Sequence, residues 1–175
     1  MATNKDVGRL AVADVETTWI KHGERPKTHF WGLAIEGEGY RRFDTSIEFW
    51  RFLADYPEKL IIYCHHDFDI VQLIVDDIYP EIHRVRGGRV LVARGPEKHE
   101  WRNSHALFSS SLAEILTSCG FEKPPLLKED DPNYLPELKR RNVADTVDTI
   151  KAFRMIAAEY EKAFDVYPLL APQTT

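Results

Sequence analysis

The sequence predicts an α/β fold, with a mixed central sheet and flanking helices. Strand-like segments come first along the chain and are then interleaved with helical segments. One segment, KLIIYC at 59–64, is apolar almost throughout, which is typical of a strand buried on both faces. With 175 residues, of which 43% are hydrophobic and 29% charged, the chain is long enough to form one domain with a large core.

The chain opens with a predicted three-stranded meander. Apolar and β-branched residues favour strands over 9–16, 28–37 and 39–44, and Gly37-Glu38-Gly39 supplies the turn between the last two. Neither an internal repeat nor a long linker interrupts the sequence. We therefore expect a single domain over 1–164 and a flexible tail over 165–175.

Helices are expected on both sides of the 59–64 strand. Residues 46–56 place apolar side chains at helical spacing, with Ser46 as the expected N-cap and Pro57 as the stop. A second helix is expected over 67–78, because its apolar residues fall on one side.

The second half of the sequence predicts a hairpin and two helices. The hairpin covers 89–102 and turns at Gly95-Pro96. A capped helix follows over 109–121, with Gly120 in the position where a C-terminal glycine is expected. A long final helix begins near Pro136 and runs to about Tyr160.

Composition argues against several classes of protein. Cys64 and Cys119 stand in no C-x-x-C or C-x-x-H spacing, so neither a disulfide framework nor a structural zinc site is expected. Export signals and apolar runs of the ~18 to 20 residues that cross a bilayer are absent from the sequence, so we expect a cytoplasmic protein without a membrane partner. The net charge of −5 disfavours a protein that coats nucleic acid, but not a nuclease, whose site concentrates carboxylates.

Basic residues gather in and before the predicted hairpin, whereas KEDDP at 128–132 is acidic. The hairpin cations could guide a nucleic-acid backbone, with a plain solvated hairpin as the alternative; they are Arg89, Arg94, Lys98 and Arg102. Trp19 and Trp101 are the candidates for stacking on single-stranded bases. Of the adjacent Phe30 and Trp31, only one is expected to face the core.

Acidic residues occur where the predicted elements could bring them together. Asp14 and Glu16 stand two residues apart in the first strand, so their side chains point to the same face. Asp69 follows the central strand, and Asp145 lies on the final helix beside the equally plausible Asp148. Each acid taken alone is explained as a solvated surface charge. Pairing of the first strand with the 59–64 strand would instead gather them in one crevice.

A pair of divalent cations would compensate the repulsion between such acids. Mg²⁺ and Mn²⁺ prefer oxygen ligands, and two ions ~3.5 to 4 Å apart can activate water and stabilise the leaving oxygen of a phosphodiester. The expected cofactors are therefore two ions of Mg²⁺ or Mn²⁺.

Three segments carry a resemblance to a known family. VADVETT, YCHHDFDI and RRNVADTVDTI resemble, in order and rough separation, the three motifs of the DEDD 3′-5′ exonucleases, which have an RNase H-like fold. Within that family, the chain most resembles the proofreading exonuclease domain of protein-primed, family B phage DNA polymerases. The resemblance covers about residues 9–160 and includes NSHALFSSSLAEIL.

The resemblance implies a role for each motif residue. Four acids would hold the two metal ions, and they are Asp14, Glu16, Asp69 and Asp145. The residues expected against the 3′-terminal nucleotides are Thr17, His65 and Phe68. A hydroxyl and an imidazole can bond sugar or phosphate oxygens, and an aromatic ring can stack on a frayed base.

The chain departs from the family pattern at three places. His65 replaces an Asn in the second motif, and Asn103-Ser104 replaces an Asp-Ser pair. Arg140 and Arg141 stand where the third motif has His or Tyr, and Arg stays protonated, so it cannot act as a general base. We expect His65 or His66 to supply the base, and the two arginines to bind phosphate, with a solvated helix start as the alternative.

The expected function is that of a metal-dependent 3′-5′ exonuclease acting on the 3′ ends of single-stranded DNA or RNA. It is expected to stand alone, because the sequence ends soon after the third motif, and a replication or repair protein is a further expected partner. The resemblance also suggests a phage origin, and hence the host cytoplasm. Two alternatives stay open, namely a catalytically impaired module that binds nucleic acid or a partner on the same fold, and a structure-specific endonuclease.

Overall fold

The structure, a computed structural model, describes residues 8–18, 23–164 and 169. These residues form a seven-stranded mixed sheet with the order β3-β2-β1-β4-β7-β6-β5. The strands are β1 (Arg9–Thr17), β2 (Thr28–Ile35), β3 (Gly39–Phe43), β4 (Leu60–Cys64), β5 (Glu81–Arg86), β6 (Arg89–Arg94) and β7 (Glu100–Asn103). Strands β1, β4 and β7 are parallel to one another, and β2 and β6 are antiparallel to them; β3 pairs antiparallel with β2, and β5 with β6. The predicted fold class is confirmed.

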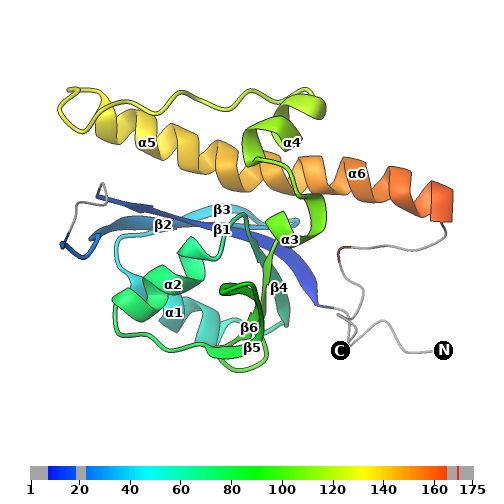
Figure 1. Ribbon diagram of the computed structural model, residues 1–175, viewed down its shortest axis with the longest axis horizontal. Helices are drawn as coiled ribbons and strands as arrows, with labels where there is room; N and C mark the ends of the chain where they lie inside the picture. Colours follow the sequence, from blue (N-terminus) through cyan, green and yellow to red (C-terminus); the bar gives the residue numbers. More distant parts are fainter. Residues whose placement is uncertain (1–7, 19–22, 165–168, 170–175) are drawn as a thin grey trace.

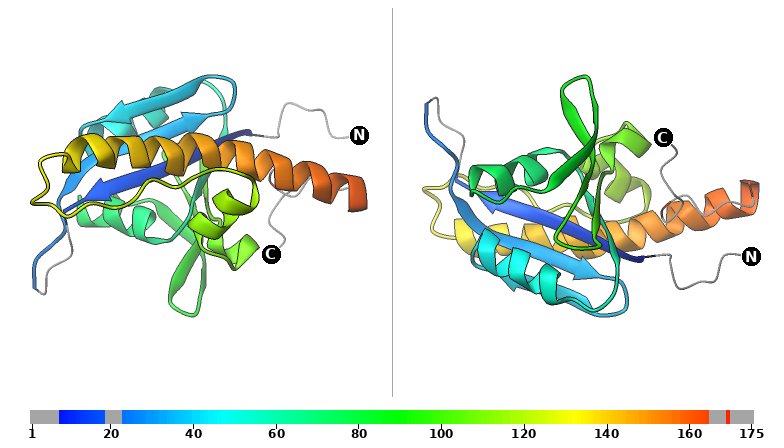
Figure 2. Two further views of the ribbon diagram at one scale, coloured as in Figure 1. Left: turned by 90° about the horizontal axis from the view of Figure 1, so that it is seen from above. Right: turned by 90° about the horizontal axis from the view of Figure 1, so that it is seen from below.

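Helices cover both faces of the sheet (Figure 1). On one face lie α1 (Ser46–Asp55) and α2 (Phe68–Val75). The other face is crossed by one long helix, which consists of α5 (Tyr134–Val143), the π-helix η1 (Ala144–Asp148) and α6 (Thr149–Phe164). The short helices α3 (His105–Phe108) and α4 (Leu112–Ser118) connect β7 to the loop before the long helix. Figure 2 shows the long helix lying along β1.

The alternation of side chains along β1 determines which core each residue joins. Ala11, Ala13 and Val15 pack with the apolar residues of α1 and α2. Leu10 and Val12 instead pack with residues of α4 and α6. Because the same alternation continues along β1, Asp14 and Glu16 lie on the same face of the sheet as Leu10 and Val12. This is the face that the long helix covers.

Because helices cover both faces of the sheet, two predictions about aromatic residues are wrong. Trp31 stacks on Phe49 with ring centroids 4.5 Å apart, while Phe30 is buried on the opposite side against the start of α5. Both adjacent aromatics are therefore in a core. Trp101 is fully buried and donates from Nε1 to the Gly95 carbonyl at 2.6 Å, so it cannot stack on a base. Trp19 lies outside the described residues.

Several element boundaries differ from the predicted ones. The N-cap of α1 is Thr45, which accepts a hydrogen bond from the Glu48 amide, because the Ser46 hydroxyl is taken by the Trp31 indole at 2.7 Å. Helix α2 ends before Ile78, because Asp77 adopts a left-handed conformation with φ of 61°. The long helix begins slightly before the expected Pro136. Ser111 and Glu114 form the capping box of α4, as the predicted capped helix required.

Strand β5 was not expected from the sequence. Its residues are all exposed and show no apolar alternation. The Gly87-Gly88 turn that leads to β6 was therefore the one feature of the sequence that could have indicated this strand. The β5–β6 hairpin projects beyond the rest of the sheet (Figure 2). The expected hairpin between β6 and β7 is confirmed.

Most of the expected tail, 165–168 and 170–175, lies outside the described residues. Leu169 is buried, and its carbonyl accepts hydrogen bonds from Tyr63 Oη at 2.9 Å and Arg102 Nη1 at 2.8 Å.

Cys64 and Cys119 are free thiols. Among the described residues, the helices are either too short or too polar to cross a bilayer.

Candidate metal centre

Parallel pairing of β1 with β4 gathers the first acids at one edge of the sheet. The register Val12↔Tyr63 places the last residues of β1 beside the segment that leads from β4 into α2. Asp69 stands in the first turn of α2, where it is buried, and its Oδ1 accepts a hydrogen bond from the Val15 amide at 3.0 Å. This bond fixes Asp69 next to Asp14 and Glu16 on β1.

The long helix brings the fourth acid to the same place. Asp145 lies in the π-helix η1, is only 5% exposed, and has an oxygen within 4.8 Å of oxygens of both Asp14 and Glu16. Asp148 instead pairs with Lys151 at 2.8 Å. The structure therefore distinguishes the two acids that the sequence left equally plausible.

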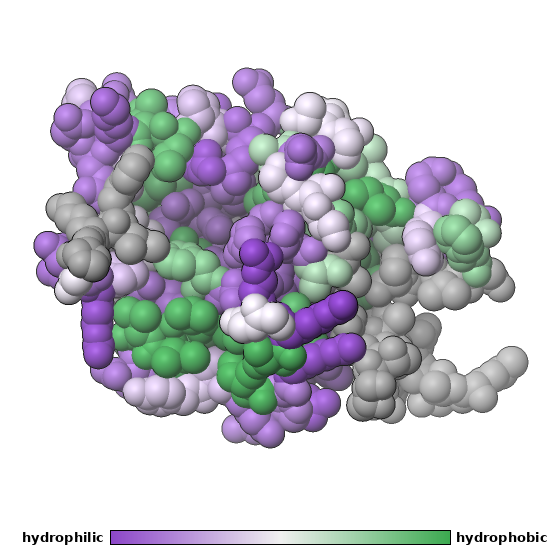
Figure 3. All heavy atoms as spheres, viewed as in Figure 1, coloured by the Kyte–Doolittle hydropathy of each residue, from purple (hydrophilic) through white to green (hydrophobic). Residues whose placement is uncertain are grey.

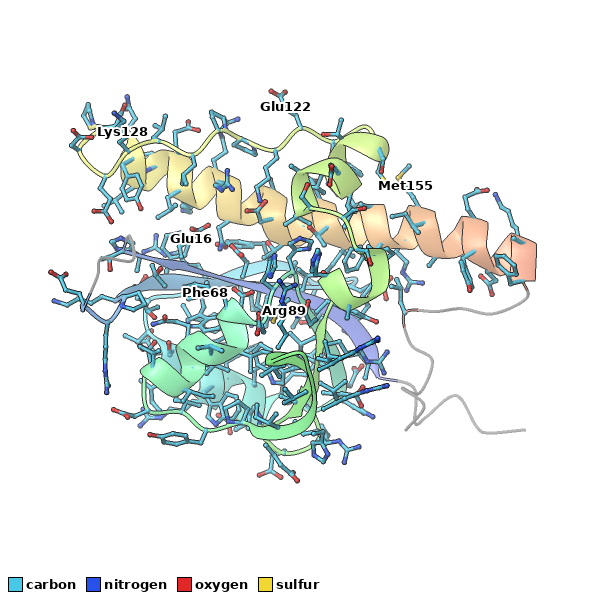
Figure 4. All side chains as sticks on the ribbon, viewed as in Figure 1. Glu16, Phe68, Arg89, Glu122, Lys128 and Met155 are labelled. Atoms are coloured by element: carbon cyan, nitrogen blue, oxygen red, sulfur yellow. The ribbon has the colours of Figure 1, made fainter. Side chains whose placement is uncertain are left out.

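The four acids line one hollow of about 320 Å³. His65, Phe68, Lys123 and Arg141 line it as well. Figure 4 shows Glu16 and Phe68 in the space between the long helix and α2, and Figure 3 shows hydrophilic side chains gathered in that region. Thr17 is not part of the lining, and its hydroxyl donates to the Thr18 carbonyl at 3.1 Å.

Burial and mutual repulsion favour the neutral form of these acids. The pKa of Asp14 is raised well above its ordinary value by burial and then by Glu16 and Asp145. Burial and the charge of Asp145 raise the pKa of Glu16 to about 7. The pKa of Asp69 is also raised, by burial and by Asp14. A cation bound between these oxygens would remove the repulsion, so the donor set and its electrostatics suit a hard divalent metal ion.

Two protein cations already reach Asp145. The Lys123 ammonium lies 2.9 Å from Asp145 Oδ1, and Arg141 Nε lies 3.6 Å from Oδ2. Burial raises the pKa of Asp145, while Lys123 and Arg141 oppose that shift. Arg140 does not line the hollow and pairs with Glu137 at 2.9 Å. Only Arg141 is therefore placed where the predicted phosphate contact could occur.

Lys123 was missed because it stands in a loop whose sequence has no periodic pattern. The loop is held against the long helix by Arg141, whose Nη1 donates to the Pro124 carbonyl at 2.9 Å. The sequence offered only a Glu122-Lys123 pair before two prolines. The partner of Lys123 could not be inferred without the packing.

Asn142 was also missed, although it ties the site together. Its Nδ2 donates to Asp14 Oδ2 at 2.7 Å, and its Oδ1 accepts from Tyr40 Oη at 2.9 Å. Gly32 on β2 makes room for this amide, because a Cβ there would lie 1.7 Å from Asn142 Oδ1. The sequence offered only an Asn three residues before Asp145, and the burial of that Asn is evident only from the structure.

His65 stands at the edge of the hollow, and its Nδ1 contacts Ser104 Oγ at 3.2 Å. Burial, followed by the neighbouring His66 and His105, lowers the pKa of His65 to about 4. The ring is thus neutral near pH 7 and able to accept a proton. Its role as the base stays a prediction.

The hairpin cations have divided roles. Arg89 joins Arg84 and Arg86 around a second hollow of about 550 Å³. Arg102 also borders it, but it is 3% exposed and bound to Glu100 at 2.7 Å, and Lys98 donates to the Pro57 carbonyl at 2.6 Å. Arg102 and Lys98 therefore stabilise the fold, and the basic surface is formed mainly by the β5–β6 hairpin.

Comparison with solved structures finds a similar fold within DNA polymerases. Phi29 DNA polymerase complexed with single-stranded DNA matches with a TM-score of 0.65 and 16% identity, over 91% of this chain and 33% of that one. The same polymerase with primer-template DNA and incoming nucleotides matches at 0.64 and 12%, over 91% and 32%. The chain has a polymerase-related fold.

A family B DNA polymerase from the hyperthermophilic archaeon Pyrobaculum calidifontis also matches, with a TM-score of 0.54 and 13% identity. The match covers 82% of this chain and 24% of that one. The chain thus spans about a third or less of the polymerases it resembles, and at these identities the likeness concerns the fold alone. No protein-family model and no curated protein matches the sequence.

Proposed function

We propose that the protein is a metal-dependent 3′-5′ exonuclease that hydrolyses phosphodiester bonds at the 3′ end of single-stranded DNA or RNA. The observation that carries the proposal is the approach of oxygens of Asp14, Glu16 and Asp145 to within 4.8 Å of one another. Asp69 completes the set through its bond to the Val15 amide. Acids held this close and at least partly buried need a compensating positive charge whenever they are ionised.

The proposed metal ligands are Asp14, Glu16, Asp69 and Asp145. Bound Mg²⁺ or Mn²⁺ would acidify water and stabilise a leaving alkoxide oxygen. The protein's part is to hold the acids in place, and Asn142 does this for Asp14 while Lys123 does it for Asp145. The donor set consists only of carboxylate oxygens, which fits hard divalent cations.

Other residues around the hollow are assigned to the substrate. Arg141 is the proposed phosphate contact, because its guanidinium borders the hollow and stays charged. Phe68 would stack on the terminal base, and Thr17 would contact the sugar or phosphate of the adjoining nucleotide. His65 would accept the proton of the attacking water.

The β5–β6 hairpin supplies a path for the rest of the strand. Its hollow is lined by Arg84, Arg86 and Arg89, and His105 belongs to the same lining. His105 and His65 also line a third hollow beside the acids, so the basic surface and the acid site adjoin. This continuity favours single-stranded nucleic acid as the substrate.

A second candidate function is that of a nucleic-acid-binding module without catalysis. The specific observation that favours it is the Lys123 ammonium at 2.9 Å from Asp145, where it competes with a metal ion for the same carboxylate. On this alternative Lys123 and Arg141 would neutralise the site permanently.

The test is a degradation assay on 5′-labelled single-stranded DNA and RNA with Mg²⁺, Mn²⁺ or EDTA. We expect a ladder of products shortened from the 3′ end with either metal, no products in EDTA, and no ladder from Asp14→Asn. Asp148→Asn, which removes the neighbouring acid outside the hollow, is the matched control and should retain the ladder. Binding without cleavage in any metal would favour the second candidate. Cleavage of a circular single strand would indicate an endonuclease.

A further inference from the structure

Three histidines meet beside the acid site. A nitrogen of each of His65, His66 and His105 lies within 4.8 Å of a nitrogen of the other two. The ring centroids are 5.2 Å apart for His65 and His66, 5.7 Å for His65 and His105, and 4.9 Å for His66 and His105. The proposed exonuclease chemistry uses at most one of these rings.

The sheet explains why residues so distant in sequence converge. Strands β4 and β7 are parallel neighbours with Cys64 opposite Asn103, so the residues that follow them leave the same edge side by side. The Ser104 amide donates to the Cys64 carbonyl at 2.8 Å, and the His105 amide donates to the His65 carbonyl at 3.3 Å. Backbone bonds therefore fix the relative positions of two of the three rings.

Hydrogen bonds orient two rings in the way that metal-binding histidines require. His105 Nδ1 lies 3.3 Å from the Ser110 carbonyl, which can only accept, so Nδ1 carries the proton and the Nε2 lone pair is open. His65 Nδ1 contacts the Ser104 hydroxyl at 3.2 Å, and when that hydroxyl accepts the Nδ1 proton, the Nε2 lone pair of His65 is open too. The exposed His66 ring makes no hydrogen bond with the described residues and can rotate toward the other two.

We propose that His65, His66 and His105 form a three-imidazole site for a transition-metal ion of the Zn²⁺ class. Imidazole nitrogens are suitable ligands for Zn²⁺ and similar transition-metal ions, whereas carboxylates are suitable for Mg²⁺ and Mn²⁺. The histidine cluster and the acid cluster would therefore bind different metals. Zn–N bonds of about 2.05 Å at tetrahedral angles put the nitrogens about 3.3 Å apart. The nitrogens, which lie within 4.8 Å of one another, would have to approach that spacing when the ion binds.

The fourth position of the ion would face the substrate cleft. His65 and His66 line the hollow that contains the four acids, and His105 lines the basic hollow beside it. An ion held by three histidines keeps a position open for water or a phosphate oxygen. Since one nitrogen of His65 would bind the metal, this role excludes its simultaneous use as a base.

The test is a zinc titration of untagged, chelator-treated protein against a chromophoric chelator. We expect one equivalent of Zn²⁺ to bind, and at least a tenfold loss of affinity in His66→Ala and in His105→Ala. His83→Ala, which removes an exposed histidine on β5, should bind as the unaltered protein does. Asp14→Asn should also retain zinc binding, so this result does not depend on whether the acids form a nuclease.

Several results would contradict the three-histidine site. Absence of zinc binding, or unchanged affinity in both His66→Ala and His105→Ala, would overturn the proposal. So would a loss of binding in Asp14→Asn with retention in His66→Ala, since the ion would then sit on the carboxylates. Thermal unfolding in EDTA checks each variant, and if His105→Ala does not fold, the exposed His66 alone decides the result.

Discussion

Asn142 and Asp14, 128 residues apart, are joined by two hydrogen bonds. Asn142 Nδ2 donates to Asp14 Oδ2 at 2.7 Å and to the Asp14 backbone carbonyl at 3.1 Å. Asn142 is fully buried, and its oxygen is occupied by Tyr40. One side-chain amide thus fixes the long helix on β1 and orients the acid at the centre of the site.

Replacing Asn142 with Ala should lower the free energy of unfolding by about 2 to 3 kcal/mol, because Tyr40 and Asp14 lose a buried partner. Urea denaturation measures this change, and Mn²⁺ affinity should fall as well. Lys139→Ala, at an exposed position on the same helix, is the control and should change neither quantity. Equal stability of the two variants would show that the amide does not hold the helix.

Gly32 should tolerate no side chain, in contrast to most glycines within strands. Replacement of a strand glycine by Ala usually stabilises. Here the new Cβ would lie 1.7 Å from Asn142 Oδ1 and 2.9 Å from Tyr40 Cε2, so Gly32→Ala should cost about 2 to 3 kcal/mol and weaken Mn²⁺ binding.

Gly37→Ala is the comparison for Gly32. Its Cβ would meet open space, but its φ of +82° makes the backbone strain about 1 kcal/mol. Mn²⁺ binding should therefore be unaffected in Gly37→Ala. Unchanged binding in both glycine variants would mean that displacement of Asn142 does not reach the acids.

Lys123→Met should leave the fold intact and reduce nuclease activity by about 10²-fold or more, since the ammonium no longer balances Asp145 during the reaction. Rates of product formation from the labelled strand measure the effect. Lys128→Met removes an exposed lysine five residues along the same loop and should be active. If Lys123→Met were instead more active, the lysine would be an inhibitor that competes with metal at Asp145.

Stability without metal should fall as pH rises toward neutrality. The folded-state pKa of Glu16 is about 7, above its ordinary value of 4.5, so its contribution is fully present below pH 4.5 and is lost as pH rises through 7. The loss amounts to about 3 kcal/mol at most. Urea unfolding in EDTA between pH 5 and 8 measures the slope.

Glu16→Gln should reduce that slope and raise stability at pH 8 in EDTA, while Mn²⁺ should stabilise the unaltered protein more at pH 8 than at pH 5. Glu48→Gln, at an exposed acid of α1, is the control. A slope that Glu16→Gln leaves unchanged would show that this carboxyl titrates normally.

The fold could be predicted in the segments whose apolar residues follow the burial of a strand. The apolar run of β4 and the alternation in β1 gave the central strands, and strand ends then placed Asp14, Glu16 and Asp69. Strand β5 could not be recognised, because its exposed residues carry no apolar pattern. Trp101 was misjudged because only the layers above the sheet decide which aromatics are covered.

The cationic and amide parts of the site were not predictable in the same way. Lys123 acts from a loop, and Asn142 acts through a space that Gly32 leaves on another strand. Both depend on the register of the long helix, which includes the π-helical segment η1. Such relationships arise from packing between elements and leave no local periodicity.

The central claim is that the four acids bind divalent cations together. The most direct measurement is anomalous diffraction at the manganese edge from crystals soaked in MnCl₂, with Asp14→Asn crystals for comparison. We predict manganese density in contact with Asp14, Glu16 and Asp145, with Asp69 at its edge, and weakened or absent density in the variant. Manganese density located elsewhere, with these carboxylates bound only by Lys123 and Asn142, would contradict the account.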